Sequence, residues 1–240
     1  MLGVERLVGG YGATTILNGA SFTARRGAIT TLIGPNGAGK STVFKAIFGL
    51  LRLREGRVVF AGEDVTGRTP AELLARGMAY VPQGRNLFPE LSVAENLELG
   101  GASLRSLSLT RERMETVMAR FPALARRARA QASTLSGGEQ KQLEIGRALL
   151  LEPKLLLIDE PSIGLSPKLV DAVFELLVQL RDEGVTILMV EQNAKKALAR
   201  SDDAVVLQQG TVVLTGPARA VLDRPDTGEL FLGGALRAAG

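Results

Sequence analysis

The nine residues from Gly34 to Thr42, GPNGAGKST, fit the pattern G-x-x-x-x-G-K-[ST] of a phosphate-binding loop. Its glycines let the backbone curl, so that successive N–H groups point inward at phosphate oxygens. Lys40 then reaches the β and γ phosphates of a nucleoside triphosphate, and Ser41 offers its hydroxyl to Mg²⁺. The residues expected to surround the nucleotide here are Gly34, Asn36, Gly37, Ala38, Gly39, Lys40, Ser41 and Thr42.

The residues around this loop have the context that the motif requires. Before it, Ile29 to Ile33 form a short apolar, β-branched run that favours a buried parallel strand. After it, the spacing predicts a helix with Val43, Ile47 and Leu50 on one face and Gly49 at its end. A strand before and a helix after distinguish a phosphate-binding loop from a glycine-rich turn that carries a surface lysine.

Two adjacent carboxylates supply a second chemical signal. Lys154 to Ile158 predicts a buried strand, and Asp159 and Glu160 follow it directly. Carboxylates at the end of a buried strand are costly unless a cation or a reaction uses them. We therefore expect Asp159 to hold Mg²⁺ through water, and Glu160 to orient or deprotonate the water that attacks the γ-phosphate.

Gln83 and Tyr11 are weaker candidates. Gln83 comes just past a predicted strand, Met78 to Val81, where open α/β sheets place ligand contacts, although such a Gln is more often an ordinary loop residue. Tyr11 lies in a glycine-rich turn, Gly9 to Gly12, in a chain with only 4% aromatic residues. Its ring either stacks on an adenine or caps the edge of a sheet, and spacing alone does not decide between them.

Ser136, Gly137 and Gly138 directly precede a predicted helix, Gln140 to Leu151. This arrangement exposes unpaired backbone N–H groups to an anion, although a plain glycine-containing N-cap has the same sequence. Since one chain rarely needs two anion sites for one nucleotide, the simplest interpretation is that these residues face a nucleotide bound to another subunit.

The remaining patterns predict the elements that position these residues. Leu2 to Val8 and Ala20 to Ala24 favour two antiparallel strands near the start. From 85 to 134 the strand signal disappears, so an all-helical insertion is expected, with Ser92 and Thr110 as N-caps. Further elements are predicted as strands at 57–60 and 186–190, a turn at 61–64, helices at 70–76, 93–99, 111–121, 168–182 and 217–222, and a hairpin of 203–207 and 211–214.

One basic cluster, Arg126 to Arg129, falls on the outer part of the insertion. It forms either a solvated face or a contact with a partner or with lipid head groups.

The composition limits the classes of protein. A single α/β domain spanning 1–240 is expected, with an aliphatic core, because 45% of the residues are hydrophobic. The absence of Cys excludes disulfides and thiolate metal sites, and the absence of His removes the usual general base near neutral pH. A net charge of +4 permits an anionic ligand but does not demand nucleic acid. No apolar run approaches the ~18 residues of a membrane span, and no signal-peptide pattern is present, so a cytoplasmic location is predicted.

The order and spacing of these motifs resemble the ATP-binding-cassette (ABC) ATPases, through Gly34–Thr42, Gln83, Leu135–Glu139 and Leu155–Glu160. The resemblance covers essentially the whole chain. It implies a P-loop NTPase fold with a mixed sheet, an N-terminal antiparallel β-subdomain and the helical insertion. Shorter runs are similar to the smaller ATPase subunit of branched-chain (hydrophobic) amino-acid importers: 81–85 with Phe88 and Pro89, 160–167, 190–193 and the ending 231–234.

Further roles follow from the resemblance alone. It implies that ATP and Mg²⁺ are bound, that Tyr11 stacks on adenine and that Gln83 senses the γ-phosphate and Mg²⁺. A second ATPase subunit, identical or different, would cap the nucleotide with its Ser136–Gly138. The helical insertion would receive membrane permease subunits, so the chain would sit at the cytoplasmic face of the membrane. A separate solute-binding protein would act indirectly, and no nucleic acid is expected.

Two departures from the general family pattern keep a different function open. Gln192 stands where most members place a histidine, and Ser166 where many carry Asp. An amide donates only a neutral hydrogen bond, which weakens hydrolysis at this site, so a nucleotide-gated clamp with little turnover is an alternative. The motifs are also compatible with an importer of urea or amides, and with a soluble ATPase of DNA repair or translation.

Overall fold

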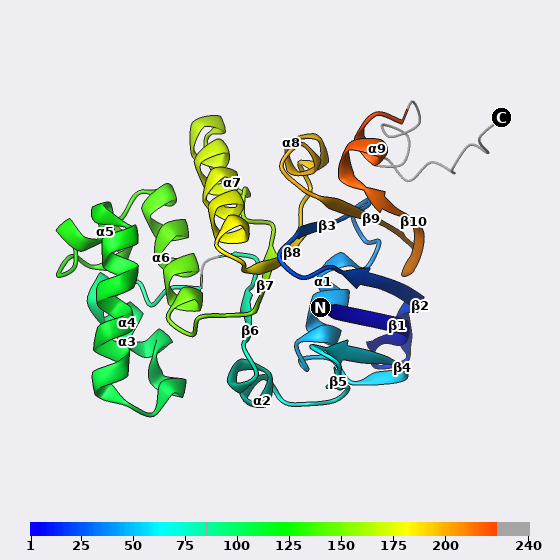
Figure 1. Ribbon diagram of the computed structural model, residues 1–240, viewed down its shortest axis with the longest axis horizontal. Helices are drawn as coiled ribbons and strands as arrows, with labels where there is room; N and C mark the ends of the chain where they lie inside the picture. The colour runs from blue at the N-terminus through cyan, green and yellow to red at the C-terminus, as the bar shows by residue number, and fades with distance from the viewer. Residues whose placement is uncertain (85, 225–240) are drawn as a thin grey trace.

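Two β-sheets and the helices around them make up the part of the chain that the computed structural model describes, residues 1–84 and 86–224 (Figure 1). Two features noted in the sequence fall outside this part. They are Arg85, which opens the predicted insertion, and the ending Phe231–Gly234.

Six strands of the described residues form the larger sheet, in the order β10-β9-β3-β8-β7-β6. Their bounds are β3 (Ile29–Ile33), β6 (Met78–Val81), β7 (Leu155–Asp159), β8 (Thr186–Val190), β9 (Asp203–Gln208) and β10 (Thr211–Pro217). Strands β9, β3, β8, β7 and β6 run parallel, whereas β10 is antiparallel to β9. Every residue of β3, β7 and β8 is buried, as expected for central strands that helices cover on both faces.

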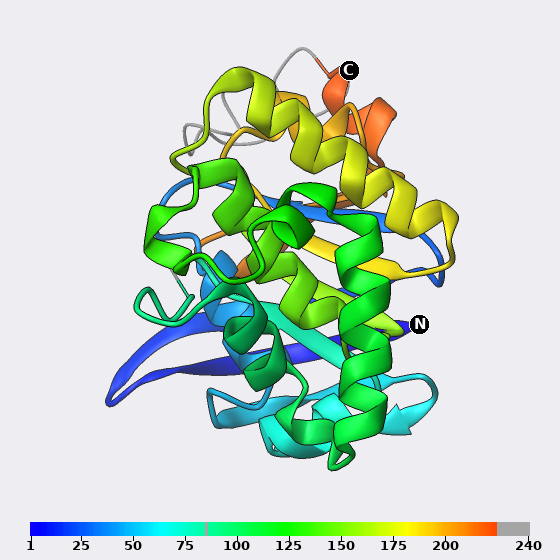
Figure 2. The same cartoon turned by 90° about the vertical axis from the view of Figure 1, so that its left-hand side faces the viewer.

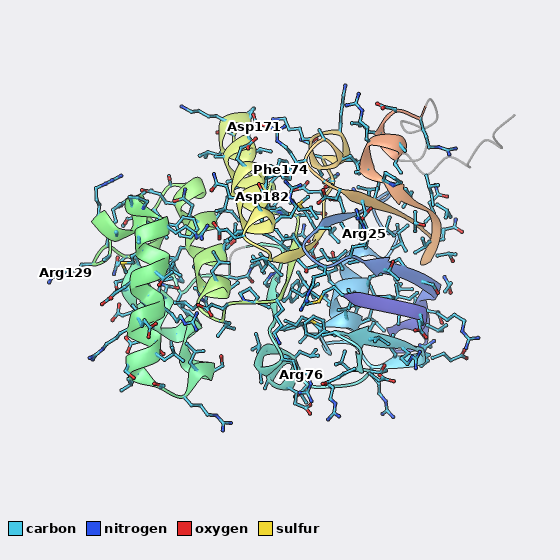
Figure 3. The ribbon with its side chains drawn as sticks, viewed as in Figure 1. Arg25, Arg76, Arg129, Asp171, Phe174 and Asp182 are labelled. Carbon is cyan, nitrogen blue, oxygen red and sulfur yellow. The ribbon has the colours of Figure 1, made fainter. Side chains whose placement is uncertain are left out.

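Helices pack on both faces of this sheet. They are α1 (Lys40–Ile47), α2 (Pro70–Ala75), α7 (Pro167–Asp182), α8 (Ala194–Leu198) and α9 (Ala218–Leu222). Phe44 of α1 shares one core cluster with Leu157 of β7, and Phe174 of α7, labelled in Figure 3, shares another with Ile158. The predicted core face of α7 is confirmed, whereas Leu50 lies beyond α1 and is 54% exposed.

The smaller sheet is antiparallel, in the order β2-β1-β4-β5. Its strands are β1 (Leu2–Tyr11), β2 (Thr14–Ala24), β4 (Leu53–Phe60) and β5 (Glu63–Asp64). The N-terminal antiparallel pair is therefore confirmed, but its turn falls later than predicted, because β1 continues through Tyr11. Glu63 and Asp64, predicted as part of a turn, instead form the short strand β5, which pairs with β4.

The turn between β9 and β10 joins the two sheets to the phosphate loop. Gln209 and Gly210 have φ angles of 47° and 76°, which suits a two-residue hairpin turn and confirms the predicted hairpin. The Gly210 N–H donates to Ala38 O, and Gly210 O accepts from Asn18 N, each at 2.9 Å. A Cβ atom on Gly210 would lie 1.9 Å from Ile16 O, so only glycine fits.

A helical group lies beside the larger sheet, green in Figures 1 and 2. It contains α3 (Val93–Gly100), η1 (Ala102–Leu104), α4 (Leu107–Arg120), α5 (Pro122–Arg126), η2 (Ala132–Thr134) and α6 (Gly137–Leu149). Its own core includes Leu97, Val117 and Leu143. The helical character of this group, with α3, α4 and α6, was predicted, whereas η1, α5 and η2 were not. The boundaries 85 and 134 of the subdomain remain a prediction.

The N-caps in this group separate a correct prediction from a wrong one. Ser92 caps α3, with a capping box that Glu95 completes, as predicted. Thr110 does not cap α4, because the helix begins earlier and Ser106 accepts from Leu109 N. Thr110 lies inside the helix, where its buried hydroxyl donates to Ser106 O at 2.9 Å. α6 likewise begins before the predicted Gln140, at Gly137.

Candidate nucleotide-binding site

A cavity of about 460 Å³ gathers residues from five separate segments of the chain. These segments are the tip of the β1–β2 hairpin, the phosphate loop, and the stretches that follow β6, β7 and β8. The lining residues are Tyr11, Ile16, Asn36, Gly37, Gly39, Lys40, Ser41, Thr42, Gln83, Glu160, Ile163 and Gln192. Candidates predicted separately from the sequence therefore meet at the carboxyl ends of the parallel strands, where open α/β sheets bind ligands.

The phosphate loop leaves the start of α1 free to bind an anion. Gly39 is the N-cap residue, with φ 99°, and no side chain caps the first N–H groups of the helix. In α2, α3 and α6, by contrast, a capping box satisfies these groups. At the other end of the loop, a Cβ atom on Gly34 would lie 2.1 Å from Leu207 O, so the loop can pass β9 only as glycine.

Lys40 lies folded across this loop and is only 7% exposed. Its Nζ donates to the carbonyl oxygens of Gly34 at 2.8 Å and Pro35 at 3.0 Å. Burial lowers the pKa of Lys40, whereas the carboxylates of Glu160 and Asp159 oppose this shift. The ammonium group is thus placed between the loop and the two acidic residues, where negative phosphate oxygens would complete its surroundings.

Asp159 ends β7, is 1% exposed and is not among the residues that line the cavity. Tyr80 Oη donates to its Oδ2 at 3.4 Å, but no described residue donates to its Oδ1. Burial raises the pKa of Asp159, against the effects of hydrogen bonds from Ser41 and Tyr80. A buried carboxylate oxygen without a partner, beside a serine hydroxyl, fits a hard cation that takes few protein ligands. Among residues 1–84 and 86–224, no group of three acidic side chains forms a complete metal cage.

Glu160 is held in an uncommon backbone conformation. Its φ of 49° lies in the left-handed region, which costs a non-glycine residue on the order of 1–2 kcal/mol. Its N–H donates to Val190 O at 2.9 Å, and its Oε2 accepts from Gln83 Nε2 at 2.8 Å. Burial raises the pKa of Glu160, and the charge of Asp159 adds to this effect. The carboxylate is therefore aimed at the cavity by contacts with neighbouring strand ends.

Tyr11 is 48% exposed at the tip of the β1–β2 hairpin, where its ring lines the cavity. Lys45 of α1 places its Nζ 5.6 Å from the ring centroid. Arg54 of β4 donates to Thr15 Oγ1 at 2.6 Å and to Gly12 O at 2.7 Å, which fixes the hairpin tip. An exposed aromatic face beside the phosphate loop is suited to stacking on a base.

Ser136, Gly137 and Gly138 do not line this cavity, because they begin α6 in the helical group. Ser136 and Gly137 are exposed, and Ser136 Oγ donates to Glu139 Oε2 at 2.8 Å. The three residues could contact a nucleotide only if that nucleotide were bound elsewhere than in the cavity of the same chain.

The basic cluster predicted on the outside of the helical group divides into two kinds of residue. Arg126 and Arg129 are exposed, and Arg129 points away from the rest of the chain (Figure 3). Arg127, in contrast, pairs with Glu139 at 3.1 Å and donates to Thr134 O at 3.0 Å. It therefore holds the loop before α6 rather than a solvated face.

Three further residues at the site had no role assigned from the sequence. Ile16 and Ile163 line the cavity, and nothing in their apolar type sets them apart from core residues. Glu191, next to Gln192, is buried. The sequence could have indicated its importance, since an acidic residue directly after a buried strand needs a hydrogen-bond partner.

Comparison with known proteins decides the family. The family model for the ABC transporter matches residues 17–163, more than half of the chain. The chain belongs to the ABC transporter family. The resemblance drawn from the motifs is thus confirmed, and the chain is an ABC ATPase that binds nucleotide.

Individual relatives match this ABC ATPase almost from end to end. The high-affinity branched-chain amino acid transport ATP-binding protein BraG of Pseudomonas aeruginosa is 41% identical over 234 residues, which are 98% of this chain and 100% of BraG. The crystal structure of the ADP conformation of MJ1267, an ATP-binding cassette of an ABC transporter, is 32% identical. Its TM-score is 0.88, over 97% of this chain and 98% of that one, which confirms the predicted fold class.

A further solved relative is dimeric. The structure of a post-hydrolysis state of the ATP-binding cassette MJ0796, bound to ADP and Pi, is 26% identical to this ABC ATPase. Its TM-score is 0.77, over 91% of this chain and 99% of that one.

Proposed function

We propose that this ABC ATPase is the ATP-hydrolysing subunit of an importer for branched-chain or other hydrophobic amino acids, at the cytoplasmic face of the membrane. The likeness to BraG over nearly all of both chains supports the transport role. The cavity supports the catalytic role, because it brings Lys40, Glu160 and Gln192 together from three different strand ends. None of the helices in residues 1–84 and 86–224 could span a membrane. Partner subunits would hold the chain at the membrane.

The uncapped start of α1 would hold the triphosphate of ATP. Its N–H groups and those of the preceding loop donate to phosphate oxygens, and the helix dipole favours the negative charge. Lys40 exchanges its bonds to the loop carbonyls for the β and γ phosphates. Tyr11 stacks on the adenine ring at the other end of the cavity.

Ser41, Gln83 and Asp159 would hold Mg²⁺, and the unpaired Oδ1 of Asp159 supports this assignment. Bound there, the ion supplies positive charge that neutralises the β and γ phosphates. Asp159 would act on the ion through water rather than as a direct ligand.

Glu160 would orient the attacking water and accept its proton, since the raised pKa of its carboxyl makes it a better base than an ordinary glutamate. Gln83 donates to Glu160 and thereby fixes the direction of the carboxylate. Gln192 donates a neutral hydrogen bond to a γ-phosphate oxygen, where charge develops during in-line displacement.

A second ATPase subunit would complete the site. Ser136, Gly137 and Gly138 lie outside the cavity of their own chain, and the exposed positions of Ser136 and Gly137 leave this helix start able to reach a neighbour's nucleotide. The dimeric MJ0796 cassette supports such an assembly. Two chains placed head to tail would each cap the other's ATP, whether the partner is a second copy or a different ATPase.

Permease subunits would dock on the helical group. A groove there is lined by Leu91, Glu95, Glu98, Leu99, Gly101, Ala102, Arg105, Ser106, Leu107 and Thr110. Leu99 and Leu107 are 44% and 70% exposed, so the groove offers two apolar side chains to a partner. The adjoining cavity includes Leu99 together with Pro82 and Asn86, so a helix seated here would lie close to the segment that carries Gln83.

Reconstitution tests the proposal directly. The chain would be co-expressed with the permeases, the second ATPase and the solute-binding protein of a branched-chain amino-acid importer, and placed in vesicles. ATP-dependent uptake of leucine is expected, and uptake of urea instead would favour the amide importer. A Glu160→Gln subunit should abolish uptake, and tight binding to nucleic acid without affinity for the permease would contradict the proposal.

The nucleotide-gated clamp is the second candidate, because Gln192 provides an uncharged contact in the cavity. Single-turnover hydrolysis by the purified chain separates the two candidates. Measurable turnover that the Glu160→Gln variant loses supports the ATPase, whereas equal and negligible rates in the two proteins support the clamp.

A further inference from the structure

Glu191 is a buried carboxylate for which the proposed reaction has no use. It follows β8, a central strand that lies between β3, which leads into the phosphate loop, and β7, which leads into Asp159 and Glu160. It is 1% exposed, and no Lys or Arg of the described residues lies within ion-pair distance of it. A buried charge without a counterion is costly, so its hydrogen bonds must account for its presence.

The two oxygens of this carboxylate bind two different catalytic segments. Oε1 accepts from Ser162 N at 2.9 Å, and Oε2 accepts from Asn193 N at 3.1 Å. Ser162 comes two residues after Glu160, and Asn193 comes directly after Gln192. Glu191 therefore bridges the turn that presents the proposed base and the segment that presents the proposed γ-phosphate contact.

The turn after β7 needs such a bond. Glu160 has its φ of 49° there, and Ile163 N donates to Glu160 O at 3.2 Å to close the turn. A left-handed non-glycine residue persists only where its surroundings hold it. The bond from Ser162 to Glu191 anchors the middle of this turn to the neighbouring strand end.

Gln192 depends on the same carboxylate from the other side. Its side chain is exposed to the cavity, while both of its neighbours are tied down. Glu191 N donates to Leu32 O at 3.4 Å, and Asn193 N donates to the Glu191 carboxylate. The backbone of Gln192 is thus fixed relative to both the phosphate-loop strand and the Glu160 turn.

We propose that Glu191 is a positioning residue for ATP hydrolysis, whose carboxylate holds the Glu160 turn and the Gln192 segment as one unit. This inference rests on the proposed function of the cavity. Glu191 does not contact the nucleotide; it fixes the distance between the group that handles the water and the group that contacts the γ-phosphate. A displacement of about 1 Å between such groups lowers the rate on the order of a hundredfold.

The test compares full-length Glu191→Ala and Glu191→Gln with Asp202→Asn. Asp202 serves as a control at the opposite end of the sheet: its Oδ2 accepts from Ile29 N at 2.8 Å at the amino end of β3, and its carboxylate also pairs with Arg181 at 3.1 Å. For Glu191→Ala we expect kcat for MgATP to fall about 10- to 100-fold, with KM changed less than about twofold. Glu191→Gln keeps one acceptor and should recover part of the loss. Asp202→Asn should lower the melting temperature and leave kcat unchanged.

An equal loss of kcat in Asp202→Asn, or a KM that rises as much as kcat falls, would overturn the proposal in favour of general destabilisation. Hydrogen exchange of the nucleotide-free proteins supplies a readout that needs no turnover. Amides in 162–165 and in 192–194 should lose protection together in Glu191→Ala, which removes both acceptors, and loss in one segment alone would overturn the bridge. If the wild-type chain binds MgATP without hydrolysing it, the proposed function fails, and hydrogen exchange still decides whether Glu191 joins the two segments.

Discussion

Removing the charge of Asp159 should stabilise the nucleotide-free protein while destroying its response to Mg²⁺. Asp159 is 1% exposed, and its Oδ1 lacks a hydrogen-bond donor among the described residues. A buried polar atom without a partner costs about 1–3 kcal/mol, and an amide at this position could donate to the Ser41 hydroxyl. For Asp159→Asn we expect a gain of about 1–2 kcal/mol in the free energy of unfolding, or about 2–8 °C in melting temperature for a chain of this size.

The stability difference between Asp159→Asn and the wild type should depend on pH. Burial raises the pKa of Asp159, so the folded protein keeps this proton at a pH where the unfolded chain has lost it. The contribution to stability is greatest below the unfolded pKa, about 3.9, and is lost as the pH rises through the folded value. The advantage of Asp159→Asn should therefore be present near neutral pH and shrink in acid.

Thermal unfolding with and without MgATP measures both effects. The wild-type protein should gain stability from MgATP through mass action, and Asp159→Asn should gain less. Ser166→Ala is a suitable control, because Ser166 makes no side-chain cap bond at α7. A nucleotide-free Asp159→Asn that melts below the wild type near neutral pH, or a difference that grows in acid, would refute the reasoning.

Three more changes have defined outcomes. Glu160→Gln should lower single-turnover hydrolysis at least about a hundredfold while keeping nucleotide affinity. In the wild type, the rate should begin to fall in acid at a pH above the ordinary carboxyl pKa, because burial raises the pKa of Glu160. A rate that does not depend on pH would contradict this. Arg54→Ala releases the hairpin tip below Tyr11 and should raise KM for ATP about three- to tenfold with kcat unchanged, whereas an unchanged KM would remove Tyr11 from the site. Gln192→His can donate a charge-assisted bond worth about 1 kcal/mol more, so turnover should rise about fivefold as the pH falls toward the histidine pKa, and a decrease would show that the amide is the better donor here.

Local patterns predicted the phosphate loop and its surroundings well, because the chemistry and the fold use the same residues. The glycines, Lys40 and Ser41 match a short motif, and the strand and helix beside them follow from apolar spacing over short stretches. The turn at Gln209 and Gly210 could be predicted equally well, since it requires two residues with positive φ.

The wrong predictions have a common physical cause. Thr110 has the right type for an N-cap, but Ser106 does also, and packing of the helical group selects the earlier start. Arg127 reads as a surface charge in a run of arginines, and only the fold brings Glu139 beside it. Contacts between residues distant in sequence, such as Glu191 with Ser162, leave no periodic signal, although an unpaired acid after a buried strand already indicates that a partner exists.

The turn at Gly210 gives the nucleotide a structural part to play. The hairpin that carries Tyr11 and the sheet that carries the phosphate loop meet at this glycine, which accepts from Asn18 N and donates to Ala38 O. A ligand that stacks on Tyr11 and binds Lys40 would form an additional connection between the same two layers. The bonds of Asn18 to Gln209 and Thr211 join these layers when the cavity is empty. ATP bound at both points would add to these contacts, so each cycle of binding and release would stiffen and relax the hairpin relative to the phosphate loop.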